Sequence, residues 1–238
     1  MSRTMIKAEI IPGMPPGAFA RRARNLAPAS ALAVLAALAG CAGSPPVRYY
    51  TLTAPVQAGK SAPAAPANYA IEVAPVSVPA QADLPQLMLR SGSGELTAQY
   101  SDRWSGPLPS ELRNALSMVL TRQLGVPDVR GLAPSPGLPV WRVQVDVQRF
   151  DASTAGPAVI DATWRVRPLQ GMGAGLLCRS RIETPVTMPA GSTDLEAVVV
   201  AEQKAVALLG QTIASAVQSQ GRQAAAASAM VRMLQCTR

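Results

Sequence analysis

The chain has 238 residues, of which 48% are hydrophobic and 15% charged, and its formal net charge is +8. It contains no histidine, which excludes Ser-His-Asp and Cys-His nucleophilic sites and every metal site with imidazole ligands. A Gly-rich phosphate-binding loop is also missing, so the sequence predicts no cofactor, no metal and no enzymatic activity.

An apolar run from Leu26 to Ala39 follows three arginines between residues 21 and 24. A basic segment, an apolar run of about 14 residues and small residues before a cut are typical of an export signal, because roughly 20 apolar residues are needed to span a bilayer. The run ends in Leu38-Ala39-Gly40-Cys41, which resembles the bacterial lipobox. This resemblance implies cleavage before Cys41 and acylation of the new N-terminus, and three acyl chains would anchor the protein firmly. The alternative is an ordinary secretory cleavage site beside an unrelated cysteine.

Cleavage at this position sets the expected boundaries of the chain. A start at Met14 would give the leader the more usual length of 27 residues. The remaining 198 residues carry 17 basic and 13 acidic side chains, and a net charge of +4 does not favour nucleic-acid binding. In the lipoproteins that this signal resembles, an aspartate after the cysteine holds the protein in the inner membrane, so the resemblance together with Ala42 implies anchoring in the outer membrane. We expect a signal peptide at 1–40, a lipidated N-terminus with a short strand and a Pro/Ala-rich segment at 41–68, a folded domain at 69–220 and an Ala-rich tail at 221–238.

Short strands and Pro/Gly-rich segments alternate in the first part of the mature chain. A strand is predicted at 48–52, where Tyr49 and Tyr50 either pair as an edge strand or contact a partner. Residues 54–68 have the composition of a linker. Further strands are predicted at 69–74, 87–90 and 95–100, the last two joined by a turn at 91–94.

Two amphipathic helices and three alternating strands make up the rest of the domain. Apolar residues at helical spacing predict a helix over 107–124, and a second helix is expected from Thr193, with Glu196 completing a capping box, to about Gln220. The tail beyond it is compatible with a helix. Strands with clean alternation are predicted at 141–148, 160–167 and 176–183. These elements predict an α+β fold, a two-layer sandwich in which a mainly antiparallel sheet packs against two helices.

Two positions of this domain, a cysteine and a tryptophan, have two interpretations each, and a third position has one. Cys178, on the packed face of its strand, either forms a disulfide with Cys236 or stays a small buried hydrophobic residue. Trp104 precedes the first helix, where it either docks a partner or staples the start of the helix. Trp164 lies on a packed face, and we expect it in the core.

Four arginines occupy the solvated face of two neighbouring predicted strands: Arg165, Arg167, Arg179 and Arg181. If these strands pair as a hairpin across the loop at 171–175, the arginines crowd one patch. Like charges directly opposite each other destabilise a sheet. The patch is then either solvated or neutralised by an acidic partner or by lipid head groups.

Three segments together resemble the PqiC/YmbA-type ABC-transport auxiliary lipoproteins, over about residues 41 to 220. They are Ser44–Leu52, which follows the lipidated cysteine, Ile71–Pro79, which is similar to the first core strand of that family, and Arg103–Leu108, which leads into the first helix. Asp83-Leu84-Pro85-Gln86 departs from the family pattern, because Leu84 stands where an arginine is usual.

The resemblance implies a lipoprotein on the periplasmic face of the outer membrane. It also implies that the protein works beside an MCE-domain periplasmic protein and inner-membrane transporter components, in lipid or hydrophobic-molecule traffic. A homo-oligomer is a further expectation, since symmetric assemblies are common. Two alternatives remain: a structural envelope lipoprotein without a transport role, and a hydrolase that uses acids such as Asp146 and Asp161, which are more simply solvated surface residues.

Overall fold

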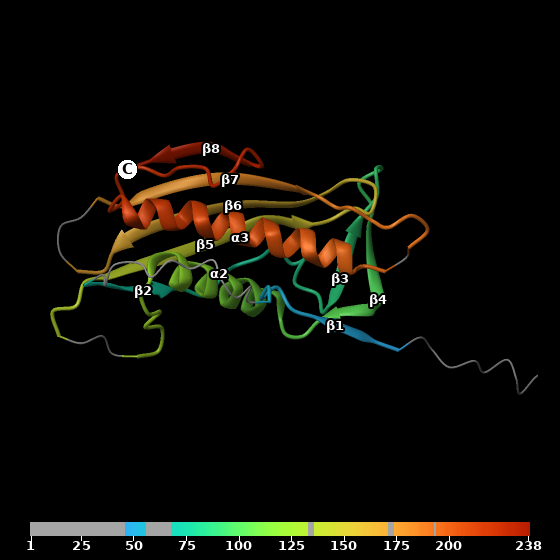
Figure 1. Cartoon of the computed structure of the whole chain (residues 1–238), viewed down its shortest axis with the longest axis horizontal. Coiled ribbons are helices and arrows are strands. Elements are labelled where there is room, and N and C mark those ends of the chain that lie inside the picture. Colours follow the sequence, from blue (N-terminus) through green and yellow to red (C-terminus); the bar gives the residue numbers. More distant parts are fainter. Residues whose placement is uncertain (1–45, 56–67, 133–135, 171–173, 193) are drawn as a thin grey trace, which may run out of the picture. The chain divides into compact units, whose positions relative to one another are not determined.

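Two helices cover one face of a five-stranded sheet, and a three-stranded sheet adjoins one end of this sandwich (Figure 1). The computed structural model describes residues 46–55, 68–132, 136–170, 174–192 and 194–238, all within the unit Pro46–Arg238. The predicted signal peptide, Cys41 and most of the predicted linker lie outside the described residues. The elements in chain order are β1 (Arg48–Tyr50), β2 (Ala70–Val73), β3 (Gln86–Arg90), β4 (Leu96–Trp104), α2 (Leu108–Leu124), β5 (Val140–Asp151), β6 (Pro157–Pro168), β7 (Leu176–Pro185), α3 (Glu196–Gln218) and β8 (Val231–Thr237).

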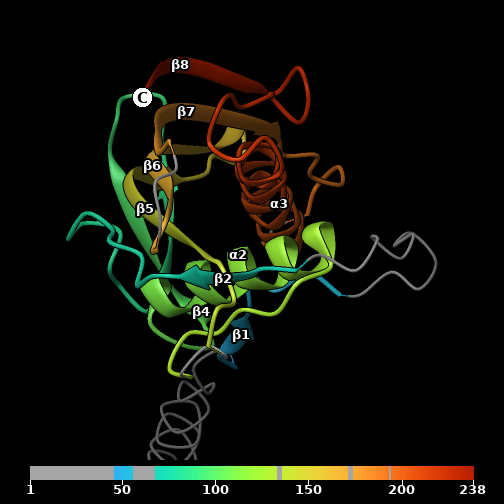
Figure 2. The ribbon, with the colours of Figure 1, turned by 90° about the vertical axis from the view of Figure 1, so that its left-hand side faces the viewer.

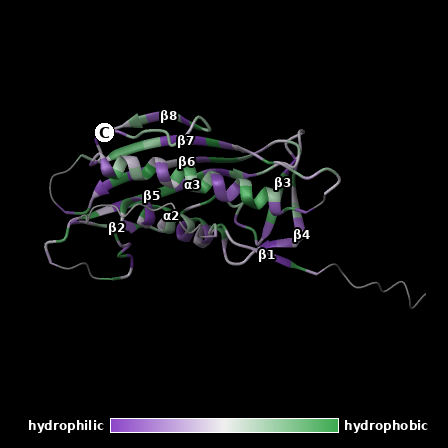
Figure 3. Cartoon of the chain, in the orientation of Figure 1, coloured by the Kyte–Doolittle hydropathy of each residue, from purple (hydrophilic) through white to green (hydrophobic). Residues whose placement is uncertain are grey.

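The larger sheet has the strand order β2-β5-β6-β7-β8. Strands β5 to β8 are successive antiparallel neighbours, whereas β2 runs parallel to β5. The predicted antiparallel meander is therefore confirmed, and its alternation buries Val143, Val145 and Trp164 on the helix side. Figure 3 shows hydrophobic and hydrophilic residues following one another along these strands.

The smaller sheet has the order β1-β4-β3. Strands β3 and β4 form the predicted antiparallel hairpin, but β4 continues as far as Trp104, and β1 runs parallel to it with Tyr50 opposite Trp104. Both sheets are thus mixed. The α+β sandwich is confirmed.

Helices α2 and α3 lie side by side on the same face of the larger sheet (Figure 2). Gly210 allows their close approach, because a Cβ at this position would lie 2.7 Å from the Cγ1 atom of Val119. Helix α3 is long and apolar enough to cross a membrane, but 67% of its most apolar window is buried inside the structure. Burial of this extent is what a core helix shows.

The predicted start of α3 at Thr193 is wrong. The helix begins at Glu196, and its N-cap residue is Leu195, which makes no side-chain capping bond. Instead, the Oδ1 atom of Asp194 accepts a hydrogen bond of 3.0 Å from the amide of Glu196. Because Leu195 is buried and fixed by the core, the chain turns into the helix two residues later than the capping-box pattern indicates. Thr193 itself lies outside the described residues.

The interpretation of the Ala-rich tail as a possible helix is also wrong. Residues 223–227 lie along α3. Three side-chain hydroxyls on one face of this helix accept hydrogen bonds from backbone amides of the tail. The hydroxyls of Thr212, Ser215 and Ser219 accept from Ala227 at 3.2 Å, Ala225 at 2.8 Å and Gln223 at 3.1 Å. These bonds replace the intrahelical bonds of an alanine helix and lead the chain back to the sheet.

The end of the tail forms β8, an edge strand paired antiparallel with β7. Cys178 and Cys236 lie directly opposite each other in this pair, and the structure joins them in a disulfide across 58 residues of sequence. Cys178 is buried, as expected from its place on the packed face, whereas Cys236 is exposed. The sheet therefore extends to residue 237, well past the expected end of the domain at residue 220.

One acid lies inside the core. Glu202 of α3 is 3% exposed, and its Oε2 atom has no hydrogen-bond partner among the described residues. It borders a void of about 10 Å³ together with Met88, Trp104, Leu108 and Phe150. Burial, and secondarily the charge of Asp151, raises the pKa of Glu202 well above its ordinary value. Burial therefore favours the protonated, uncharged form of this carboxyl group in the folded protein.

Replacing this acid by an apolar side chain of similar length is expected to stabilise the fold. Glu202→Met removes an unsatisfied buried polar group, which costs about 1–3 kcal/mol. This gain in the free energy of unfolding grows as the pH rises above about 4.5, the ordinary pKa of a glutamate. There the unfolded chain releases its proton while the folded chain retains it, so wild-type stability falls by up to about 1.4 kcal/mol per pH unit.

Denaturant unfolding of both proteins at pH 5 and pH 8 measures this difference. The matched control is Glu196→Met, an exposed acid on the same helix, which should show neither the gain nor its pH dependence. A gain from Glu202→Met that does not change with pH would contradict a neutral buried carboxyl group.

Opening the disulfide is expected to loosen β8. Cys236→Ser should lower the free energy of unfolding by about 2–4 kcal/mol and speed amide hydrogen exchange in β8 more than in β6. Thiol labelling of denatured, non-reduced mature protein should detect no free thiol at Cys178 or Cys236, and labelling after reduction should detect both. Two free thiols before reduction would exclude the bond.

Candidate functional site

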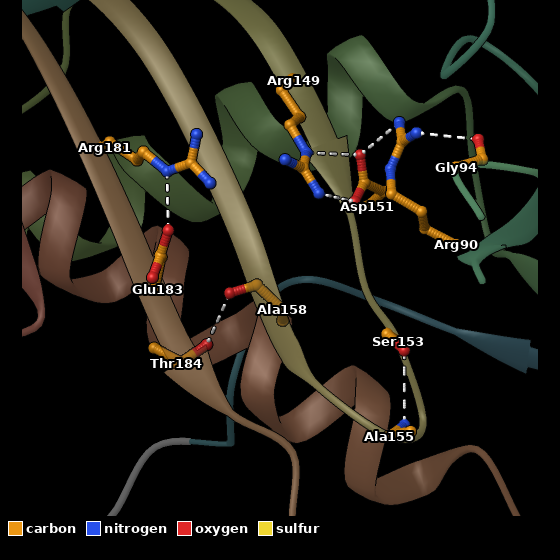
Figure 4. A network of polar contacts seen from close by, with 10 residues as sticks. All are labelled: Arg90, Gly94, Arg149, Asp151, Ser153, Ala155, Ala158, Arg181, Glu183 and Thr184. Carbon is orange, nitrogen blue, oxygen red and sulfur yellow. Dashed lines mark hydrogen bonds and ion pairs between the residues drawn. The ribbon is translucent and has the colours of Figure 1, made fainter. Parts of the chain in front are cut away.

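A buried ion-pair cluster joins the two sheets at Asp151, the last residue of β5 (Figure 4). Its carboxylate accepts hydrogen bonds of 2.8 Å from both Nε and Nη2 of Arg149, and one of 2.9 Å from Nη2 of Arg90. Arg90 belongs to β3, in the smaller sheet, and its amide also donates to the carbonyl of Ala152 at 2.8 Å. Charge-assisted bonds of this kind are roughly twice as strong as neutral ones, so the cluster fixes one sheet against the other.

This cluster is built for structure rather than proton transfer. Burial alone would raise the pKa of Asp151, but the hydrogen bonds from Arg149 and Arg90 outweigh it and hold that pKa below its ordinary value. Asp151 borders a cavity of about 130 Å³ with its oxygens already bonded to guanidinium groups, whereas Glu202 borders the separate small void. A general acid and a general base would have to face one substrate position together, and these two acids do not.

The two acids suggested for a hydrolase, Asp146 and Asp161, also accept hydrogen bonds from neighbouring side chains. Asp161 is 7% exposed and accepts bonds of 3.0 and 2.9 Å from Nε and Nη2 of Arg179, so its interpretation as a solvated residue is wrong. Asp146 is exposed and accepts from the hydroxyl of Ser77 and the amide of Gln148. The register places Thr163 opposite Asp146, and Arg181 and Arg149 opposite Asp161, so the acids do not form a pair.

The two tyrosines of β1 have different surroundings. The hydroxyl of Tyr50 donates to Oδ1 of Asp102 at 3.1 Å, and burial followed by this bond raises the pKa of Tyr50 to about 12. Arg48 pairs with Asp102 at 2.8 Å and with Asp194, just before α3, also at 2.8 Å. Tyr49 is 65% exposed. Tyr50 is thus part of the edge pairing and its ion-pair network, and Tyr49 is the tyrosine of β1 that a partner can reach.

The carboxylate of Glu111, in the first turn of α2, holds the segment that follows β1. One oxygen accepts from the hydroxyl of Thr51 at 2.7 Å and from the amide of Leu52 at 3.0 Å, and the other accepts from the hydroxyl of Ser105 at 2.6 Å. The side chain of Gln203 in α3 donates to the carbonyl of Thr51 at 2.8 Å. Two segments that resemble the family, 44–52 and 103–108, therefore meet here, which their separate patterns do not reveal.

Trp104 belongs to the core. Its side chain is 4% exposed, and its ring lies 6.1 Å from that of Phe150, measured between centroids. Its place opposite Tyr50 at the end of β4 turns it toward the junction of the two sheets. The interpretation of Trp104 as a partner-docking residue is therefore wrong, because its side chain is covered by the domain itself.

The four arginines of the solvated face do not form one shared patch. Arg179 pairs with Asp161 at 2.9 Å, and Arg181 pairs with Glu183 at 2.7 Å, so acids of the same domain neutralise two of the four. Arg165 stands between two uncharged partners, Gln144 on β5 and Leu177 on β7. Arg167 lies opposite Arg142, which pairs with Glu72 at 2.6 Å. Arg165 and Arg167 have no ion pair in the part of the chain that the structure describes.

Comparison with known proteins defines the family. Residues 50–214 match the family described as ABC-type transport auxiliary lipoprotein component. A DUF330 protein from Xanthomonas campestris, XCC0632, has the same fold: its crystal structure aligns with a TM-score of 0.54 at 21% identity, over 74% of this chain and 98% of that chain.

The crystal structure of an uncharacterized protein aligns with a TM-score of 0.56 at 18% identity, over 73% of this chain and 99% of that chain. No curated protein matches this sequence. The family match covers most of the folded unit and confirms the resemblance seen in the sequence. The chain belongs to the family of ABC-type transport auxiliary lipoprotein components.

Proposed function

We propose that this protein is a lipoprotein anchored through Cys41 to the periplasmic face of the outer membrane. There it serves as an accessory subunit of an MCE-type ABC transport system that moves lipids or other hydrophobic molecules, and it supports envelope integrity. Its partners are an MCE-domain periplasmic protein and inner-membrane transporter components. The observation that supports this function most directly is the clamp on residues 51–52, which holds the segment leading to Cys41 against the domain.

The short tether determines where the domain can act. Tyr49 is only the eighth residue after Cys41, and at about 3.3–3.6 Å per extended residue this tether reaches no more than roughly 30 Å. From Thr51 the chain is fixed to α2 and α3 by Glu111 and Gln203. A domain held this close to its membrane cannot cross the periplasm alone, so a partner has to reach it.

Binding is the function that the described residues support. The buried acids are held by arginines or enclosed in the core, and the family is one of auxiliary transport components. Several copies acting together would suit a symmetric partner, because closed symmetric assemblies are the usual form of soluble oligomers. The alternative is a structural envelope lipoprotein that takes no part in transport.

Acylation of Cys41 has a direct test. The intact mass of protein extracted from membranes should equal residues 41–238 plus a lipid increment, and Cys41→Ser should shift the protein to the soluble periplasmic fraction. Cys236→Ser is a matched control, since it removes a cysteine outside the signal and should leave the protein membrane-bound. Membrane retention of the Cys41→Ser protein would refute this anchor.

Participation in transport is tested in cells. Deleting the gene should increase sensitivity to membrane-active compounds, and at least one photo-crosslinker among the exposed positions Tyr49, Thr97, Gln144 and Gln223 should capture an MCE-domain protein. A crosslinker at buried Trp104 is the negative control. If no position captures such a protein and sensitivity is unchanged, the structural lipoprotein becomes the better description.

A further inference from the structure

The domain has two chemically different ends, and α3 runs between them (Figure 1). Asp194, just before the helix, pairs with Arg48 of β1, so this end carries the segment that leads to the predicted anchor. The 23 residues of α3 span about 35 Å. The chain then turns at Gly221, which lies at the opposite end beside the loop between β6 and β7.

Contacts at this second end bring together arginines of β5 and β6, beside the segment that follows α3. Gly221 has a φ of +70°, and a Cβ there would lie 2.3 Å from the carbonyl oxygen of Ala174, so the tail passes tightly against the loop. A Cβ on Gly175 would lie 3.3 Å from Cβ of Arg167 and 3.9 Å from Nε of Arg165. Arg142, Arg165, Arg167 and Arg222 thus gather at this end, which we call the basic end.

Among the described residues, Glu72 is the acid that pairs with an arginine of the basic end, and Arg238 adds a further guanidinium, which donates to the carbonyl of Arg222. The sequence has no Asp or Glu between Asp161 and Glu183, and none after Glu202. The ion pair between Arg142 and Glu72 is the one salt bridge that the four arginines make within the described residues. Arg165 and Arg222 are exposed to solvent.

This arrangement is unfavourable for the isolated domain. Arg142 and Arg167 face each other in the β5–β6 ladder, and like charges directly opposite each other destabilise a sheet. Arg179 and Arg181, on the same face, each have an acid, so the sheet is able to place acids beside its arginines. At the basic end it does so only for Arg142. An acidic group supplied from outside would remove the repulsion and complement the field of the exposed arginines.

We propose that the basic end docks an acidic surface of a periplasmic partner protein. This inference rests on the proposed function, in which the partner comes to a domain tethered near its membrane. A protein surface fits better than anionic lipid, because the tether is attached at the other end of a helix about 35 Å long and reaches roughly 30 Å. In this proposal the membrane that holds the anchor lies beside β1, and the basic end faces away from it.

Crosslinking in living cells tests this assignment with the full-length, processed lipoprotein. Photo-crosslinkers at Gln144 and Gln223 probe the basic end, and one at Thr97 of β4 probes the tethered end; all three positions are exposed. We expect capture of a periplasmic protein from Gln144 and Gln223 but not from Thr97. Mass spectrometry should map the captured segment to a stretch rich in Asp and Glu.

Charge reversal provides the quantitative test. Arg165→Glu should reduce capture from Gln144 by about tenfold, because it places like charges together in the interface. The matched control is Arg103→Glu, the same change at the tethered end, which should leave capture unchanged. Changing Asp or Glu residues of the captured segment to Lys should restore capture by the Arg165→Glu protein. An unchanged melting temperature verifies that Arg165→Glu folds, as expected for an exposed side chain flanked by Gln144 and Leu177.

Three results would overturn the assignment: a lipid adduct at Gln144 and Gln223, capture that survives Arg165→Glu, or capture from Thr97 alone. If Thr97 alone captures an MCE-domain protein, the proposed function stands and the docking surface is wrong. If the basic end captures an acidic protein without an MCE domain, the docking surface stands and the proposed transport role is wrong.

Discussion

The carboxylate of Glu111 is the contact on which the placement of the whole domain depends. It accepts three hydrogen bonds, from Thr51, Leu52 and Ser105, while itself only 8% exposed. Removing one partner of a buried charged group leaves that group unsatisfied, at a cost of about 1–3 kcal/mol or more. Because these bonds hold the chain from the tenth residue after Cys41 onward, they decide, under the proposed anchoring at Cys41, which end of the sandwich carries the tether.

The remaining polar contacts make the sandwich one rigid body between that end and the other. Asp151 locks the smaller sheet to the larger one through Arg90 and Arg149, and Gly210 lets the two helices pack closely. Hydroxyl groups of α3 then guide the tail into β8, where the disulfide closes the edge of the sheet. Under the proposed anchoring at Cys41, such a body would present its other end to a partner, as the proposed docking role requires.

Periodicity in the sequence was sufficient for the elements whose side chains alternate regularly. The strands around Trp164 and the stripe along α3 appear where the pattern places them. The pattern failed where a local irregularity changed the register: a shift between Val147 and Arg149 turns Asp151 inward, and nothing in the alternation predicts it. The prediction for the tail failed because backbone amides of the tail donate hydrogen bonds to hydroxyls of α3. Alanine content does not reveal this tertiary contact. Glu202 did carry a signal, since it is an acid within the apolar stripe of a helix.

The central claim is that the domain stands with β1 toward the membrane and the basic end away from it. Paramagnetic relaxation measures this directly, in the acylated protein placed in bilayers that contain a gadolinium-chelating lipid. A spin label at Thr97, at the tethered end, should relax markedly faster than one at Gln223, at the basic end. Equal relaxation at the two positions, or faster relaxation at Gln223, would show that the basic end lies on the membrane and would contradict the claim.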